Sequence, residues 1–338
     1  MKRKHIISFI VLLFVLVFTS ACGNGDKEQQ ADKQSKAEDN TENTVEELQL
    51  PEAALQKLDS GEDVKALQLA LKEIGYDIKD NGDFDAATVW AITDLQMQKD
   101  LPLTGIYEQE TAEVVKQLVE DGNHDFEPGK KLPAKAEPAT TDSGTNVIAN
   151  PYEQLVLVNK ENALPADYTP VDLVVPDINY PFTEDLPKKK VRKIAATAIE
   201  DLFAAADKAG LELFAQSGYR SYDRQETVFA SNVQSLGEKQ ANQLSARPGE
   251  SEHQTGLTMD VTSRDMGFQL NEDFANTDEG KWLAENAAEY GFIIRFPKGK
   301  EEITQYQYEP WHIRYVGKKA AKEITENDLT LEEYLTAE

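Results

Sequence analysis

Cysteine and histidine are both scarce in this chain of 338 residues. The single cysteine, Cys22, excludes an intrachain disulfide bond and any metal site built on several thiolates. A bound metal ion would therefore need imidazole and carboxylate ligands. Imidazoles are few, because the sequence holds only four histidines: His5, His124, His253 and His312.

Basic residues are outnumbered as well. The 35 lysines and arginines face 61 aspartates and glutamates, which gives a formal net charge of −26 and an isoelectric point near 4.6. This charge excludes broad contact with nucleic acid or with an anionic membrane surface, and it favours solubility. We therefore expect no nucleic-acid partner, and we expect the chain to act as a monomer. Its length is sufficient for two modest domains and linkers.

The first 22 residues have the pattern of an export signal. Lys2–Lys4 form a charged start, and the apolar run Ile6–Phe18 is too short for a comfortable membrane span. The small residues Thr19–Ala21 then lead into Cys22. This resembles a bacterial lipoprotein signal, in which the cysteine is lipidated and becomes the mature N-terminus. An ordinary secretory signal with an unrelated cysteine is the alternative, and both predict export.

The composition of two stretches of the chain predicts linkers. Residues 23–50 are polar, with eight acidic residues against three lysines, so they cannot bury enough surface to offset the entropy of ordering, and we expect a disordered tether. Residues 121–150 contain three prolines that interrupt any periodicity, which predicts a second, semi-rigid linker. His124 lies in this second linker, where we expect its side chain to be solvated.

Residues 51–120 show helical periodicity and an internal repeat. Apolar side chains fall on one helix face at Val64, Leu67, Leu71 and Ile74. A glycine turn, an aromatic residue and an acidic residue near a helix start occur twice, over Gly82–Thr88 and Gly105–Thr111. This stretch resembles the three-helix peptidoglycan-binding domain that accompanies many cell-wall hydrolases, and we expect it to bind the cell wall. A helical spacer without a ligand is the alternative.

Residues 151–338 predict one compact domain of common size. The apolar pattern predicts these elements in chain order: a strand-like run at 155–158, a helix over 191–203, a strand over 211–215, a helix from 222, a strand over 258–262, a helix over 278–290, and strands over 292–296 and 311–316. Helices and strands do not alternate regularly. The expected fold class is therefore α+β, with a small antiparallel sheet flanked by helices, preceded by the small three-helix domain.

Two short stretches of this domain concentrate the metal-binding residue types: Ser251–Asp260 and Glu309–His312. They supply His253, Asp260 and His312, three groups that can hold one zinc ion. Three protein ligands with one open position are typical of a catalytic zinc site, whereas structural sites fill all four positions with protein groups. We therefore expect one zinc ion per chain.

Strand alternation is expected to bring these groups together. Asp260 points away from its apolar neighbours on one expected strand, and His312 does the same on the last strand. Gly256 lies between His253 and Asp260 and permits the tight turn that brings both to one centre.

Glu309 and Arg220 are the expected catalytic residues. Glu309 precedes the last strand and is placed to exchange a proton with metal-bound water, whose pKa zinc lowers to about 7. Arg220 offers a planar fork of donors for a substrate carboxylate or a developing oxyanion. Taken singly, each of these residues would more often have a structural role. The two complete motifs together favour the metal site.

The motifs Ser-x-His-x-x-Gly-x-x-x-Asp and Glu-x-Trp-His, preceded by Ser-Gly-Tyr-Arg-Ser, resemble those of the VanY-type D-alanyl-D-alanine carboxypeptidases. These zinc peptidases share the fold of the VanX dipeptidases and of the hedgehog signalling domain. The resemblance covers about 180 residues. It implies that His253, Asp260 and His312 bind zinc, and that Glu309 is the general base and acid.

The same resemblance implies a substrate. Arg220, Gln225 and Ser251 would hold a peptidoglycan stem peptide while its C-terminal D-alanine is removed. Some family members act on a pentapeptide, and others act on a tetrapeptide in which the preceding residue has the L configuration. D-alanyl-D-alanine carboxypeptidase is the expected activity, and L,D-carboxypeptidase is an alternative.

Two further alternatives remain open from the sequence. An endopeptidase that cuts within stem peptides would not need a positive anchor for a terminal carboxylate, so Arg220 favours a carboxypeptidase. A non-catalytic wall-binding or signalling protein would not need Glu309. The expected location is the extracellular face of the bacterial cytoplasmic membrane, with a lipid anchor on Cys22 and association with the cell wall.

Overall fold

The computed structural model describes residues 49–122, 126–132 and 139–336. The export signal, Cys22, nearly all of the tether, and His124 lie outside these ranges, so the expectations for them stay predictions. All described residues belong to one compact unit, Glu47–Glu338. Among the helices of the described ranges, none is long and apolar enough to cross a membrane.

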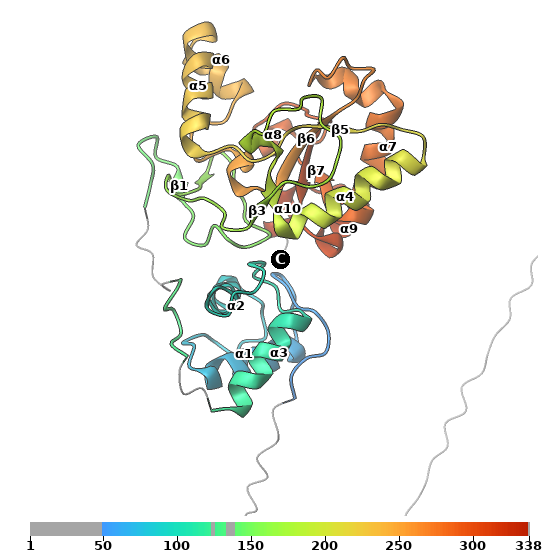
Figure 1. Ribbon diagram of the computed structural model, residues 1–338. Helices are drawn as coiled ribbons and strands as arrows, with labels where there is room; N and C mark the ends of the chain where they lie inside the picture. The colour runs from blue at the N-terminus through green and yellow to red at the C-terminus, as the bar shows by residue number, and fades with distance from the viewer. Residues whose placement is uncertain (1–48, 123–125, 133–138, 337–338) are drawn as a thin grey trace, which may run out of the picture. The chain divides into compact units, whose positions relative to one another are not determined.

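Three helices form the N-terminal part of this unit: α1 (Glu62–Ile74), α2 (Ala86–Gln98) and α3 (Gln109–Glu120) (Figure 1). Their apolar faces meet in one hydrophobic core, which confirms the expected three-helix arrangement. Gly75, with φ at 112°, ends α1 in the left-handed conformation that glycine adopts without strain. The Asp85 side chain caps α2 by accepting a hydrogen bond from the Thr88 backbone N–H.

The sequence repeat is also a structural repeat. The Gln68 side chain of α1 accepts from the Gly82 N–H at 2.8 Å, and the Gln96 side chain of α2 accepts from the Gly105 N–H at 2.9 Å. Each glutamine is buried and also donates to a carbonyl of the turn that it holds. Two buried amides thus support the same glycine turn in both copies.

A four-stranded antiparallel sheet lies at the centre of the C-terminal part, in the order β5-β6-β8-β7. Its strands are β5 (Phe214–Ser217), β6 (Thr258–Thr262), β7 (Phe292–Ile294) and β8 (His312–Tyr315). Two small sheets accompany it: β1 (Asn146–Val147) with β2 (Asn162–Ala163), and β3 (Leu173–Val174) with β4 (Val191–Arg192). The expected α+β class with a small antiparallel sheet is confirmed.

Helices flank this sheet (Figure 1). They are α4 (Lys193–Lys208), α5 (Tyr222–Leu236), α6 (Glu238–Leu244), α7 (Asp278–Asn286), α8 (Glu301–Thr304), α9 (Lys318–Glu326) and α10 (Leu331–Thr336). Short 3-10 helices are η1 (Pro187–Lys189), η2 (Glu252–Thr255), η3 (Glu272–Asn276) and η4 (Ala287–Tyr290). Because α4 and α7 share one hydrophobic core with β6 and β8, they fix the two strands that carry the metal-binding residue types.

Two sequence expectations differ from the observed elements. The run 155–158 is mostly buried but pairs with no strand of the described ranges: its side chains alternate between two hydrophobic clusters as in a strand, while the Arg314 side chain donates to the Gln154 and Val156 carbonyls. The strand expected over 211–215 begins only at Phe214. The Leu211 N–H bonds back to the Ala206 carbonyl, so Leu211 still belongs to the turn that closes α4.

Arg192 connects the two parts of the unit. Its side chain is 1% exposed, and its guanidinium donates to the Leu103 carbonyl at 2.7 Å, to the Tyr152 carbonyl at 2.8 Å and to the Asp172 carboxylate at 2.9 Å. A buried cation is tolerated only where its donors find partners, and these three acceptors supply them. The Arg192 side chain therefore forms a satisfied polar contact between the three-helix part and the C-terminal part.

Removing the Ile199 side chain should destabilise the C-terminal part. Ile199 lies on α4, is fully buried, and packs in the core that supports β6 and β8. Ile199→Ala should lower the free energy of unfolding by about 2–5 kcal/mol, measured by denaturant titration. The same exchange at Ile303, whose exposed fraction is 38%, should change it by less than about 1 kcal/mol. Equal losses in the two variants would contradict this account of the core.

Candidate metal centre and active site

Strand pairing places two of the expected ligands opposite each other. In the β6–β8 ladder, Asp260 is the register partner of His312. His253 enters from η2, which ends at Gly256 with φ at 68°. A Cβ at Gly256 would lie 2.9 Å from the Leu173 side chain, so glycine is needed there for both its conformation and its size.

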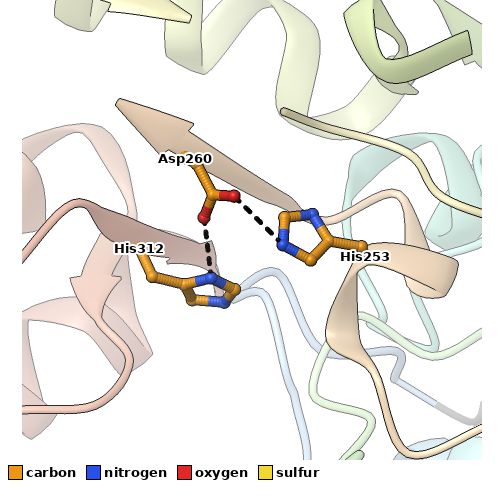
Figure 2. A group of neighbouring side chains, drawn as sticks. All are labelled: His253, Asp260 and His312. Atoms are coloured by element: carbon orange, nitrogen blue, oxygen red, sulfur yellow. Dashed lines mark hydrogen bonds and ion pairs between the residues drawn. The ribbon is translucent and has the colours of Figure 1, made fainter. Parts of the chain in front are cut away.

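The three side chains converge on one point (Figure 2). The Asp260 carboxylate lies 3.3 Å from His253 Nε2 through one oxygen and 3.0 Å from His312 Nδ1 through the other. Their ligand atoms all lie within 4.8 Å of one another, and all three residues are buried. Two ligand atoms of a tetrahedral zinc, each about 2.0–2.1 Å from the metal, lie about 3.3 Å apart. The observed spacing therefore fits a single zinc ion.

Hydrogen bonds fix which nitrogen each histidine presents to this point. His253 Nδ1 donates to the Gly218 carbonyl at 2.7 Å, which leaves the Nε2 lone pair facing Asp260. The Thr258 hydroxyl donates to the Ile313 carbonyl, so it accepts from His312 Nε2–H at 2.9 Å. The Nδ1 lone pair of His312 is therefore the one that faces the other two ligands. Such partners set the tautomer and orientation of metal-binding imidazoles.

A buried carboxylate supports this arrangement from behind. Glu252 accepts from Arg295 at 2.7 Å and from Arg314 at 2.6 Å through one oxygen, and its other oxygen lies 3.4 Å from His312 Nε2. Burial raises the pKa of the Glu252 carboxyl, but the two arginines outweigh burial and hold that pKa well below its usual range. Arg295 in turn pairs with Glu332 of α10 at 2.6 Å. Glu252 is thus a permanent anion beside a candidate ligand.

The sequence analysis did not identify Thr258, Glu252, Arg295 or Arg314. The sequence offered one signal for Glu252: its position between Ser251 and His253 within the metal motif. The structure shows that this part of the motif is buried. The two arginines stand among apolar strand residues, where a charge calls for a partner. Their partner is distant in the chain, so only the folded structure reveals it.

The surroundings of Asp260 favour its anionic form. Burial alone would raise the pKa of this carboxyl, but His253 and His312 hold it far below its usual range. At His253 the pKa is lowered, first by burial and then by the nearby Arg220 charge. A deprotonated carboxylate and a neutral imidazole are the forms that bind metal ions. At His312 burial lowers the pKa, but the hydrogen bonds to Asp260 and Glu252 outweigh burial and raise it to about 9, so a metal ion bound by this imidazole would displace a proton.

Glu309 lies beside the three candidate ligands and does not complete their cluster. Its carboxylate oxygen is 3.7 Å from His312 Nδ1, and its backbone N–H donates to the Phe296 carbonyl. Burial raises the pKa of Glu309 to about 7, while the His312 charge opposes that rise. A carboxyl with a pKa near neutrality can both accept and return a proton at working pH.

Arg220 reaches the same cavity from the loop after β5. It donates to Gln225 Oε1 at 2.9 Å and to Ser217 Oγ at 3.2 Å. The Gln225 amide is itself held by the Ala246 carbonyl at 2.7 Å. Gln225 was expected to bind substrate, and it lines the cavity. In the structure its amide oxygen accepts from Arg220 and its amide nitrogen donates to Ala246, so it positions Arg220.

A cavity of about 220 Å³ joins these residues. Its lining includes His253, Asp260, His312, Glu309, Arg220, Gln225 and Ser251. Every site residue expected in the C-terminal domain thus borders one cavity. The space can hold a small terminal residue of a peptide, with a proton acceptor on one side and a guanidinium on the other.

Comparisons with known proteins agree with this geometry. The sequence profile of the VanY D-alanyl-D-alanine carboxypeptidases matches residues 188–318, and that of the putative peptidoglycan binding domain matches residues 60–115. The chain is 59% identical over 191 residues to the putative carboxypeptidase YodJ of Bacillus subtilis (strain 168), a match that covers 56% of this chain and 70% of that protein. The chain belongs to the VanY family.

Two other similar proteins are named for a carboxypeptidase activity. A D-alanyl-D-alanine carboxypeptidase of Enterococcus faecalis (strain ATCC 700802 / V583) is 34% identical over 226 residues, covering 60% of this chain and 78% of that protein. The solved structure of the LdcB LD-carboxypeptidase is 57% identical, with a TM-score of 0.57, and covers 59% of this chain and 92% of that chain. The family resemblance inferred from the motifs is confirmed.

Thr258 should tune metal affinity without contacting the metal. Thr258→Val keeps the side-chain shape but removes the acceptor for His312 Nε2–H, so zinc affinity should fall by about 10- to 100-fold. Competition with a chromophoric chelator measures this change. Thr258→Ser retains the hydroxyl and should bind zinc as the parent does. Unchanged affinity in Thr258→Val would show that the hydroxyl does not orient His312.

Proposed function

We propose that this VanY-family enzyme is a zinc carboxypeptidase that removes the C-terminal D-alanine from peptidoglycan stem peptides. The observation that carries the proposal is the convergence of His253, Asp260 and His312 on one point of a cavity that also holds Glu309 and Arg220. Three nitrogen and oxygen ligands leave one coordination position open, as catalytic zinc sites require. When bound, zinc would supply Lewis acidity and lower the pKa of water in that position to about 7.

Glu309 and Arg220 are proposed to act on the substrate. Glu309 accepts the proton of the attacking water and returns it to the leaving amine, a transfer that its pKa of about 7 suits. Arg220 donates hydrogen bonds to the substrate carboxylate or to the negative charge that develops on the scissile carbonyl. Gln225 holds the Arg220 fork in place, and Ser251 lines the cavity beside it.

The configuration of the residue before the scissile bond is the main alternative. D-alanyl-D-alanine carboxypeptidase activity follows from the family profile and from the Enterococcus faecalis relative. L,D-carboxypeptidase activity on tetrapeptide stems is favoured by one specific observation, the higher identity of 57% to the LdcB LD-carboxypeptidase. Both activities use the same metal centre and release the same amino acid.

Defined peptides distinguish these activities. The purified chain with zinc should release D-alanine from a synthetic stem pentapeptide ending in D-alanyl-D-alanine, from a tetrapeptide ending in an L-centre followed by D-alanine, or from both. Mass spectrometry identifies the products. Peptides with a C-terminal amide should resist cleavage, because they lack the carboxylate that Arg220 would hold. Internal cleavage, or equal cleavage of the amides, would replace the carboxypeptidase assignment with an endopeptidase.

Glu309→Gln separates proton transfer from metal binding. The variant should keep its zinc, because Glu309 is outside the three-residue cluster, while its turnover should fall by about 10²- to 10⁴-fold. Elemental analysis measures the zinc and product release measures the turnover. Glu302→Gln, an exposed exchange on α8, is the matched control and should change neither. Turnover retained by Glu309→Gln would remove this residue from the mechanism.

The remaining parts of the chain are proposed to place the enzyme at the cell wall. The peptidoglycan-binding profile over residues 60–115 supports a wall-binding role for residues 51–120, and residues 151–338 are proposed as the catalytic domain. The sequence pattern of residues 1–22 supports lipidation at Cys22, which would anchor the chain to the outer face of the cytoplasmic membrane. Segment 23–50 is proposed as a linker. Within 121–150, residues 129–132 bond to Asp94 of α2 and Asn146–Val147 form β1, so only the stretch between them remains a proposed linker.

Wall binding can be tested with a segment that has its own core. Residues 49–132 contain α1 to α3, and Asp94 of α2 accepts hydrogen bonds from the backbone N–H groups of Gly129, Lys131 and Leu132. This segment should sediment with purified cell-wall sacculi. Residues 139–336 should sediment less and still cleave soluble peptides. A segment 49–132 that folds but stays in the supernatant would contradict the wall-binding role.

A further inference from the structure

Lys160 holds together two segments that lie far from each other in the chain. Its ammonium donates to the Asn242 carbonyl at 2.7 Å and to the Gln305 carbonyl at 2.6 Å. It also lies over the Tyr306 ring, 4.5 Å from the ring centroid. Two carbonyls and an aromatic face therefore satisfy a cation that has no part in the mechanism proposed above.

Both carbonyls lie at the C-terminal end of a helix. Asn242 is in the last turn of α6, and Gln305 directly follows α8. Carbonyls at such positions have no intrahelical N–H to accept from, and a lysine can bind them instead. The Lys160 side chain is half-buried, and burial lowers the pKa of Lys160 against the opposing effect of Glu250. Lys160 is therefore part of the packed structure and not a solvated surface charge.

Gln305 has an unfavourable backbone conformation that Lys160 helps to hold. Its φ of 61° lies in the left-handed region, which is strained for a residue with a Cβ. Lys160 binds the Gln305 carbonyl, and the neighbouring Glu161 accepts from the Gln305 side-chain amide at 3.1 Å. Such conformations persist only where the surroundings fix them, so without Lys160 we expect Gln305 to relax.

The chain after Gln305 leads directly to the proposed proton acceptor. The Tyr306 ring packs against the Phe296 ring, with centroids 4.6 Å apart. The Glu309 backbone N–H donates to the Phe296 carbonyl at 3.0 Å. Gln305 and Phe296 thus hold the two ends of the stretch that carries Glu309, and a movement of Gln305 would change where the Glu309 carboxylate points.

The other carbonyl that Lys160 binds belongs to the support of Arg220. The Gln225 amide that accepts from Arg220 also donates to the carbonyl of Ala246, which lies just after α6. Ala246 packs in one small hydrophobic cluster with Phe296 and Tyr306. The end of α6 and the stretch before Glu309 therefore meet at this cluster.

The helix pair α5 and α6 has little packing of its own to fix it. The two helices lie side by side and project from the rest of the C-terminal part (Figure 1). Gln225 and Ala241 are the fully buried residues within them. Elements with few buried contacts are the ones that move most easily, so a hydrogen bond at the end of α6 has a large influence on its position.

We propose that Lys160 is a positioning residue for catalysis. By joining the end of α6 to Gln305, it sets the separation between the Arg220 guanidinium and the Glu309 carboxylate, which both border the catalytic cavity. Lys160 itself lies outside the lining of that cavity. The inference rests on the proposed function, because it takes Glu309 as the proton acceptor and Arg220 as the substrate anchor.

Lys160→Met tests this role. Methionine keeps an apolar stem but has no N–H donor, so turnover should fall by about 10- to 100-fold, as expected when catalytic groups move by about 1 Å. Zinc content should stay that of the parent, because the candidate ligands come from η2, β6 and β8. Product release measures turnover, and elemental analysis measures zinc. Lys239→Met, the same exchange at an exposed lysine of α6, is the matched control and should change neither.

Chemical rescue distinguishes hydrogen bonding by Lys160 from a general loss of structure. Lys160→Ala leaves room for a small amine, so propylammonium should raise its turnover by about 10-fold, as expected for hydrogen bonds from a charged donor. Tetramethylammonium carries the same charge without N–H donors and should give no rescue. The parent enzyme in the same amines controls for effects on zinc.

Hydrogen exchange measures the contact without turnover. The backbone amides of residues 241–246 and 305–309 should exchange about 10-fold faster in Lys160→Met than in the parent, because both segments lose a hydrogen bond that holds them. Lys239→Met should exchange as the parent does. Unchanged exchange in both segments of Lys160→Met would overturn the inference.

The other outcomes separate Lys160 from the proposed function. Unchanged turnover in Lys160→Met, or equal rescue by both amines, would overturn the inference, because neither result needs the N–H donors. Loss of zinc or of folding in both variants, without rescue by propylammonium, would show a purely structural role and would also overturn it. If the parent cuts stem peptides internally and releases no D-alanine, the carboxypeptidase assignment fails. Lys160→Met should still lower that internal cleavage, because Glu309 would serve both reactions.

Discussion

The register between β6 and β8 is the constraint on which the rest of the site depends. It sets Asp260 opposite His312 in adjacent strands, so that a carboxylate and an imidazole meet without any special loop geometry. A slip of one residue in β8 would turn His312 away from Asp260 to the other face, which the core with α4 and α7 occupies. The apolar residues that alternate with the ligands pack in this core, and they therefore fix the direction in which the ligands point.

The buried charges around Glu252 extend this constraint to the rest of the domain. Arg295 and Arg314 are both fully buried, and such cations are costly unless a carboxylate and further acceptors satisfy them. Glu252 bonds to both, and Arg314 also donates to the carbonyls of Gln154 and Val156. This cluster makes one side of the metal centre rigid, whereas Arg220 and Gln225 border it from a loop and from α5.

The sequence was sufficient for the parts of the fold that local patterns control. Apolar periodicity predicts the bounds of β6 and the existence of α4 and of the three N-terminal helices. Glycines such as Gly75 mark where a helix ends. The scarcity of histidine directed attention to His253 and His312, which the structure brings together with Asp260. The family could be named because the motif residues are spaced along single strands and turns, where sequence distance and spatial distance agree.

Other features depend on contacts between segments far apart in the chain. The run 155–158 has the side-chain alternation of a strand, yet the distant Arg314 side chain donates to the Gln154 and Val156 carbonyls, and no strand in the described part of the chain pairs with the run. Thr258 and Glu252 support His312 only because 54 and 60 positions of intervening chain fold back on them. A cavity beside the metal centre likewise brings together Lys188 of η1, Arg220 of the loop after β5 and Arg224 of α5, and no local pattern in the sequence indicates that they are neighbours.

The contact between Glu332 and Arg295 makes the metal centre depend on the last described helix. Glu332 lies on α10, 37 positions beyond Arg295, and Arg295 also holds the Glu252 carboxylate beside His312. Without α10, the buried arginine would lack one of its two counter-ions. The integrity of α10 is therefore coupled to the support of a metal-binding histidine that it does not touch.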